Sequence, residues 1–200
     1  ALLLIFAVKD IYPFGDNSFL RTDMYHQYAP FFAEFADKLQ NGGSLLYSWK
    51  VGAGSNFITL LAYYLLSPFN LALVFLSKPA VIEFMTYLIV FKSGLAGLSM
   101  AWYLCRKFDT RTITAALFAM GYALSGYMAA YSWNIMWLDC IMLFPIILLG
   151  LEQLVKEKRG TLYCITLGLS ILSNYYISIM ICIFMVIYVI AQMILKPPKS

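Results

Sequence analysis

Long apolar runs separated by short polar breaks dominate the second half of the chain. These runs occupy 81–105, 113–131, 138–155, 161–173 and 176–195. A helix needs about 20 mostly apolar residues to cross about 30 Å of hydrocarbon. The stretch 161–195 would be about 52 Å long as one helix at 1.5 Å per residue, so the polar residues at 173–176 are expected to divide it. The pattern predicts an all-α, polytopic transmembrane bundle with five complete spans.

The first part of the chain has a different pattern. Residues 1–8 are apolar but too few to cross a bilayer, so we interpret them as the end of a first span and expect the chain to be an amino-terminal fragment of a longer protein. Residues 9–79 form a long loop. Within it the apolar stretch 57–77 is interrupted at Ser67-Pro68 and Asn70, and proline breaks a helix interior. We expect two short interfacial helices there, because a crossing would reverse the side of every later loop.

Another segment of this loop has helical periodicity. Apolar side chains at Phe31, Phe32, Phe35 and Leu39 alternate with the charged Glu34, Asp37 and Lys38, and Gly42-Gly43 supplies a stop. The spacing predicts an amphipathic helix that lies along the membrane surface with its apolar side toward the lipid.

Composition agrees with a membrane protein, and the charges indicate its orientation. Hydrophobic residues make up 62% of the chain and charged residues 12%, against about 45–50% and about 25% in soluble domains. The net charge of +4 comes from clusters beside the apolar runs: Arg106/Lys107/Arg111, Lys156/Lys158/Arg159 and Lys196/Lys199. Such clusters are typical of cytoplasmic loops, so no nucleic-acid partner is expected. Residues 9–79 and the tips of the two later hairpins are then extracytoplasmic.

The remaining charges and the cysteines change this picture little. Glu83 and Lys92 fall within the run 81–105. We expect Glu83 to reach water and Lys92 to face the bundle interior, because an unpaired charge in a bilayer is costly. Asp109 and Glu152 are expected to be solvated at cytoplasmic ends. The four cysteines lie far apart in apolar surroundings without metal-binding spacing, so we interpret them as small core residues.

Polar and aromatic residues gather in the segments predicted to be extracytoplasmic. The first loop contributes Arg21, Asp23, His26, Gln27 and Tyr28, a second stretch contributes Trp49, Lys50 and Asn56, and the hairpin tips contribute Trp133, Asn134, Asp139, Asn174 and Tyr175. Aromatic rings can cover the apolar face of a sugar while amides and carboxylates bind its hydroxyl groups. The alternative for the tryptophans and tyrosines is an ordinary interfacial belt, which does not call for a carboxylate.

Three stretches of the chain resemble a known family. "YPFGDNSFLRTDMYHQYAPFF", "LYSWKVGAGSNFITLLAYYLLSPFN" and "NYYISIMICIF" are similar to the amino-terminal part of the YfhO family of bacterial membrane proteins, which belongs with the GT-C superfamily of lipid-dependent glycosyltransferases. The resemblance implies a GT-C-like bundle in the bacterial cytoplasmic membrane. It also implies transfer of a sugar from a polyprenyl-phosphate donor to an envelope polymer such as teichoic acid, on the extracytoplasmic face.

The resemblance further implies roles for particular residues. An acid in the first outer loop is the usual base of GT-C enzymes, and Asp23 matches that position, with His26, Gln27 and Tyr28 as pocket residues of the same motif. A positioned carboxylate can take the proton of an acceptor hydroxyl in the transition state. The donor phosphate calls for a cation, for which Arg21 and Lys50 are the candidates. No cofactor follows from the residues. Some superfamily members bind a divalent cation through outer-loop acids, and Asp10 and Asp16 could assist one here.

Two other classes of function remain open at this point. A transporter or flippase of lipid-linked sugars would depend on Glu83 and Lys92 more than on Asp23. A non-catalytic membrane scaffold would tolerate substitution at both sets of residues.

Overall fold

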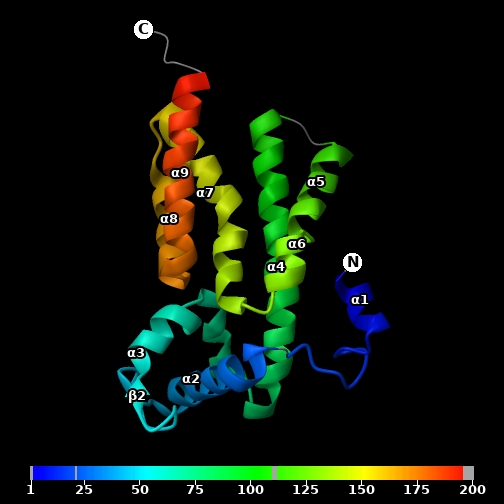
Figure 1. Ribbon diagram of the computed structural model, residues 1–200, viewed down its shortest axis with the longest axis vertical. Coiled ribbons are helices and arrows are strands. Elements are labelled where there is room, and N and C mark those ends of the chain that lie inside the picture. Colours follow the sequence, from blue (N-terminus) through cyan, green and yellow to red (C-terminus); the bar gives the residue numbers. More distant parts are fainter. Residues whose placement is uncertain (1, 21, 110–111, 196–200) are drawn as a thin grey trace.

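The computed structural model describes residues 2–20, 22–109 and 112–195 and is mostly helical in that part of the chain. Figure 1 shows a bundle of upright helices whose lower end is covered by a layer built from the first 80 residues. This architecture confirms the predicted all-α, polytopic class.

The bundle contains the apolar runs identified in the sequence. Its helices are α4 (Val81–Phe108), α5 (Ile113–Ala123), α6 (Gly126–Tyr131), α7 (Leu138–Glu157), α8 (Thr161–Ser173) and α9 (Tyr175–Leu195). The predicted span 113–131 is interrupted after Ala123, where the hydroxyl of Ser125 accepts a hydrogen bond from the backbone N–H of Met128 and caps α6. Helix α4 continues three residues past the predicted end at 105.

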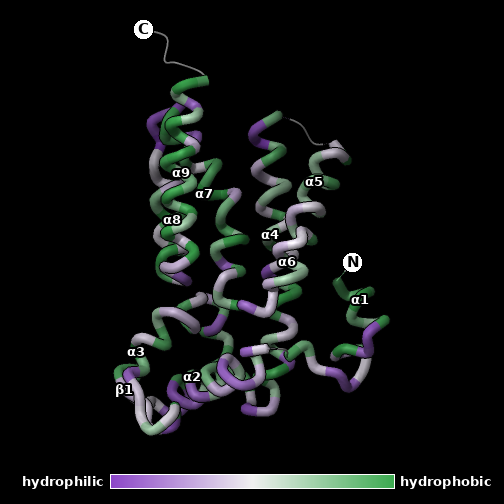
Figure 2. The backbone as a smooth tube through the Cα atoms, viewed as in Figure 1, coloured by the Kyte–Doolittle hydropathy of each residue, from purple (hydrophilic) through white to green (hydrophobic). Residues whose placement is uncertain are grey.

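Within the described residues, four helical segments are long and apolar enough to cross a membrane: Lys78–Phe108, Ile113–Tyr131, Ile135–Glu157 and Tyr175–Leu195. Helix α8 has 13 residues and covers about 20 Å at 1.5 Å per residue, which is less than the hydrocarbon thickness. Hydrophobic residues predominate along the bundle, and hydrophilic ones are more frequent in the layer below it (Figure 2).

The covering layer consists of short elements. These are a π-helical turn (Met24–Tyr28), α2 (Ala29–Asn41), the strands β1 (Tyr47–Ser48) and β2 (Ser55–Asn56), α3 (Phe57–Leu60), a second π-helical turn (Leu61–Leu65), and 3₁₀ helices at Pro68–Phe75 and Lys78–Ala80. Helix α1 (Leu2–Val8) lies to the side of the bundle (Figure 1). The segments Phe57–Leu65 and Pro68–Phe75 meet at 110°. This bend falls at the Ser67-Pro68 break noted in the sequence, and we call 57–75 the bent segment.

Helix α2 differs from the prediction in what its two sides contact. Phe32 and Phe35 are 2% and 4% exposed and belong to a core that also includes residues of the bent segment and α4. The expectation that this apolar side faces lipid was therefore wrong. The reason is that the bent segment and α4 offer it apolar protein surface, which buries it more completely than an interface would.

The two ends of the bundle also differ. The α6–α7 and α8–α9 turns lie at the same end as the covering layer, while the C-terminal ends of α4, α7 and α9 lie at the other end (Figure 1). Lys107, Lys156 and Arg159 belong to that second end. The described members of the basic clusters and the long loop are thus at opposite ends of one bundle, while Arg111, Lys196 and Lys199 lie outside the described residues.

Glu152 is the exception to the expectation of solvated charges at this end. Its carboxylate forms an ion pair with Lys107 and accepts hydrogen bonds from the hydroxyls of Tyr103 (3.0 Å) and Tyr188 (2.6 Å). Lys156 lies 3.4 Å from its second oxygen. The side chain of Glu152 is only 9% exposed, because α4, α7 and α9 all supply donors around it.

Candidate functional site

Asp23 lies directly before the π-helical turn and is exposed. Its carboxylate makes no hydrogen bond or ion pair within the described part of the chain. His26 is also exposed, and its ring meets that of Tyr25 edge-on with centroids 5.2 Å apart. Arg21, a predicted phosphate contact, falls outside the described residues. Asp23 is therefore a carboxylate open to solvent at the end of the bundle that carries the long loop.

Gln27 and Tyr28 connect this turn to two distant segments. The amide of Gln27 donates to the hydroxyl of Tyr64 (3.2 Å), and the hydroxyl of Tyr28 donates to Oδ1 of Asn134 (2.9 Å). Burial raises the pKa of the Tyr28 hydroxyl, and the nearby charge of Asp23 raises it further. Tyr28 therefore keeps its proton as a donor, and Asp23 lies close enough for its charge to act on this hydroxyl.

Aromatic rings extend from Tyr28 in two directions. Trp133 stacks on Tyr28 at 6.2 Å, and Tyr64 lies 5.5 Å from it. Tyr63 then contacts both Tyr64 (4.6 Å) and Tyr175 (5.8 Å). We call Tyr28, Tyr63, Tyr64, Trp133 and Tyr175 the aromatic cluster. It links the first loop to both hairpin tips, and Tyr175 at its end is 48% exposed.

Asn174 fixes the second hairpin tip against the bent segment. Its Oδ1 accepts from the backbone N–H of Ile177 at 3.0 Å, which caps α9, and its Nδ2 donates to the carbonyl of Tyr63 at 3.0 Å. The side chain is fully buried. Asn174 therefore holds Tyr63 in place, and both ends of its amide are already engaged.

Asp139 also lies inside the protein. Its side chain is 1% exposed, and its two oxygens are bound by Lys92 (2.6 Å) and by the hydroxyl of Ser67 (2.9 Å). Lys92 faces the bundle interior as expected, with a partner that the sequence did not indicate. The predicted substrate contact at Asp139 thus corresponds to a carboxylate with both oxygens occupied.

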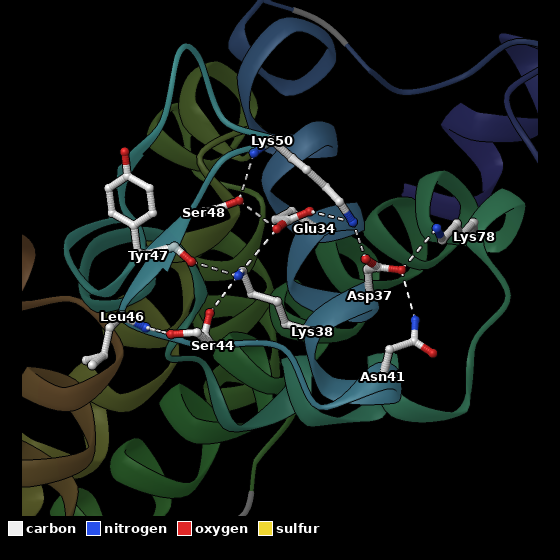
Figure 3. A network of polar contacts seen from close by, with 10 residues as sticks. All are labelled: Glu34, Asp37, Lys38, Asn41, Ser44, Leu46, Tyr47, Ser48, Lys50 and Lys78. Atoms are coloured by element: carbon white, nitrogen blue, oxygen red, sulfur yellow. Dashed lines mark hydrogen bonds and ion pairs between the residues drawn. The ribbon is translucent and has the colours of Figure 1, made fainter.

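The remaining predicted residues lie on the hairpin that follows α2. Figure 3 shows how this hairpin covers the polar side of the helix. Ser48 donates to Glu34 at 2.7 Å, and Lys38 donates to the carbonyl of Ser44 at 2.6 Å. The ammonium of Lys50 lies 2.5 Å from Asp37. We call Glu34, Asp37, Lys38, Lys50 and Lys78 the charge cluster.

Lys50, the cation predicted to meet the donor phosphate, is already paired with Asp37 in the charge cluster. Hydrogen bonds from Lys50 and then Lys78 lower the pKa of Asp37 to about 2, and the same carboxylate raises the pKa of Lys50. Trp49 is 77% exposed beside Tyr47, and Asn56 is exposed on β2. No hydrogen bond, ion pair or ring contact among the described residues joins these hairpin residues to Gln27 or Tyr28.

The structure thus divides the predicted site. Gln27, Tyr28, Trp133, Asn134, Asn174 and Tyr175 come together near Asp23, whereas Trp49, Lys50 and Asn56 form part of a separate surface. Sequence reasoning missed Tyr63 and Tyr64, which join the two hairpin tips to the loop. The available signal was a pair of adjacent tyrosines in an otherwise apolar helix, within the "AYYLLSPFN" stretch.

A divalent cation would need ligands of its own. Among the described residues, no group of three or more His, Cys, Asp or Glu side chains is arranged to hold a metal ion. Asp10 and Asp16 are both exposed.

A bundle with four candidate spans, closed at one end by a loop layer that holds a polar and aromatic site, defines a polytopic helical membrane protein. The chain belongs to the YfhO family: the family model described as "Bacterial membrane protein YfhO" matches residues 1–200. This confirms the resemblance noted in the sequence. No curated protein and no solved structure matches the chain.

Proposed function

We propose that this protein is an extracytoplasmic glycosyltransferase, or the part of one that holds its catalytic base. It moves a sugar from a polyprenyl-phosphate donor in the cytoplasmic membrane to an envelope polymer such as teichoic acid. Membership of the YfhO family supports a glycosyltransferase-like role in a membrane. The placement of the basic clusters opposite the loop layer supports an extracytoplasmic site.

One observation carries the proposal: an exposed carboxylate, without a hydrogen bond or ion pair to any of the described residues, stands beside a cluster of rings and amides drawn from four separate segments. Asp23 directly precedes the turn that carries Gln27 and Tyr28, and these two residues bind Tyr64 and Asn134. Rings packed in this way offer apolar faces for a sugar. The hydrogen bonds fix the geometry of the surrounding segments before substrate arrives, which lowers the entropy cost of binding.

The proposed reaction needs a single base. The carboxylate of Asp23 takes the proton from the acceptor hydroxyl as that oxygen forms a bond to the anomeric carbon of the sugar. The bond between this carbon and the phosphate oxygen breaks, and the polyprenyl phosphate leaves with the electron pair from the opposite face. The product has an inverted anomeric centre. Arg21 is the remaining candidate to meet the phosphate, since Lys50 is already bound to Asp37.

The test is transfer by the complete protein in lipid nanodiscs, with a radiolabelled polyprenyl-phosphate sugar and an isolated envelope polymer. Asp23→Asn should lower kcat by about 10²–10⁴-fold, the usual contribution of a general base, while expression and membrane insertion stay normal. Glu157→Gln is the control, because it removes an exposed carboxylate at the opposite end of the bundle. Transfer by Asp23→Asn at the wild-type rate would remove the mechanism. Movement of the lipid-linked sugar across the membrane without bond formation would favour a flippase instead.

A further inference from the structure

An ion pair lies sealed beneath the candidate site. Lys92 on α4 and Asp139 on α7 are 0% and 1% exposed, and Nζ of Lys92 lies 2.6 Å from Oδ2 of Asp139. The same ammonium donates to the carbonyl of Ile135 at 3.1 Å and lies 5.9 Å from the ring centroid of Phe69. The other oxygen of Asp139 accepts from Ser67 at 2.9 Å. Both oxygens of Asp139 and two of the three N–H donors of Lys92 are thus bound by protein.

Such a pair is weak evidence for stability. The desolvation of two buried charges offsets most of their attraction, and apolar residues of similar size often replace a buried pair without loss. Charged side chains within membrane proteins usually mark a functional role. The contacts of this pair therefore need an explanation beyond holding α4 against α7.

The first contact reaches the bent segment. Ser67 stands in the break between Phe57–Leu65 and Pro68–Phe75, three residues after Tyr64. The helix before the break carries Tyr63 and Tyr64 into the aromatic cluster. Its C-terminal end leads directly into this break. The hydrogen bond from Ser67 to Asp139 ties this break to α7.

The second contact reaches the first hairpin tip. Ile135, whose carbonyl binds Lys92, directly follows Asn134, which accepts the hydroxyl of Tyr28. One buried pair thus makes polar contacts with two segments, and each segment supplies a part of the site that the other lacks. Its own atoms do not reach the solvent.

We propose that Lys92 and Asp139 are positioning residues that hold the Tyr63–Tyr64 helix and the Asn134 tip in register with Asp23. This inference rests on the proposed function for its purpose, but the arrangement itself can be tested without any transfer assay. The pair does not touch substrate. Its effect on the reaction passes through Ser67 and through the Ile135 carbonyl.

The decisive variant removes both charges at once. Lys92→Met/Asp139→Leu replaces the pair by apolar side chains of similar size, and its thermal midpoint in nanodiscs should stay close to that of the wild type. Hydrogen exchange of amides 57–66 and 133–135 should become roughly tenfold faster, the change expected when a hydrogen bond to a charged group is lost. Exchange in α9 should not change. The kcat for transfer should fall by a similar factor.

A second variant removes only one of the two contacts, the hydrogen bond from Ser67 to Asp139. Ser67→Ala deletes only the hydroxyl that binds Asp139 and should speed exchange in 57–66 without changing 133–135. Ser99→Ala is the matched control, because among the described residues its buried hydroxyl on α4 bonds only to the carbonyl of Ala96. It should leave exchange in both segments and the rate of transfer unchanged.

The outcomes separate this inference from the function proposed above. Unchanged exchange at 57–66 and 133–135 in the double variant would overturn it, and so would faster exchange with unchanged kcat. Faster exchange in a protein whose wild type transfers no sugar would refute the glycosyltransferase and still support the positioning of these two segments. Faster exchange with a lower kcat and an intact thermal midpoint supports both.

Discussion

Two lysine–carboxylate pairs join α4 to α7, one near each end of the bundle, and their surroundings differ. Lys92 and Asp139 are almost completely inaccessible and are completed by one serine hydroxyl and one backbone carbonyl. At the other end Lys107 is 24% exposed, and Glu152 receives two tyrosine hydroxyls and a second lysine. A lysine and a carboxylate thus form a sealed pair at one end and a shared, partly solvated pair at the other.

The difference in burial between the two ion pairs determines how much each charged group depends on its partner. In the sealed pair neither charge can turn to water, so the loss of one leaves the other without compensation. In the shared pair water and several donors can replace a missing group. Removing one partner should therefore lower the free energy of unfolding more at the sealed pair than at the shared pair.

The largest effect is expected from Lys92→Met. The unpaired carboxylate of Asp139 would remain buried, which should lower the free energy of unfolding by about 3–5 kcal/mol. SDS titration of the purified protein in mixed micelles measures this loss. Adding Asp139→Leu to the same chain is the control and should recover most of it. Equal stability of the single and double variants would show that the pair is not sealed.

A smaller effect is expected from Glu152→Gln. The amide oxygen can still accept from Tyr103 or Tyr188, while the attraction to Lys107 is lost, and the partial exposure of that lysine limits the cost. The free energy of unfolding should fall by about 1–2 kcal/mol in the same titration. Glu157→Gln, an exposed change on the same helix, is the control and should have no measurable effect. A loss as large as that of Lys92→Met would erase the contrast between the two ends.

The sequence predicted what depends on local pattern. Spans such as α4, α7 and α9 follow from run length because the bilayer imposes that length, and the inward orientation of Lys92 follows from the cost of exposing a charge to lipid. The break at Ser67-Pro68 follows from the missing N–H of proline. These features need no knowledge of what the chain packs against.

The sequence pattern does not predict which residues contact one another across long separations. Tyr28 and Asn134 are 106 residues apart, and Lys92 and Asp139 are 47 apart. Such contacts depend on how whole elements pack, which no periodicity encodes. Asp139 was therefore interpreted as a substrate contact at a hairpin tip, and Tyr63 and Tyr64 were not assigned to the site.

The smallest effect is expected from Lys156→Ala, and it sharpens the comparison within the second end. Lys156 is 67% exposed and lies 3.4 Å from Glu152, one helical turn away on α7. Exposed pairs of this spacing contribute about 0.3–0.5 kcal/mol, and salt screens them. The SDS titration should show a loss within that range, and the loss should shrink further in high salt. Arg159→Ala, which removes an even more exposed pair with Glu157, is the control. A loss above about 1 kcal/mol would exceed what an exposed pair supplies. It would mean that the donors around Glu152 act as one cooperative network, so that this end is as intolerant of a missing partner as the sealed pair beneath the candidate site.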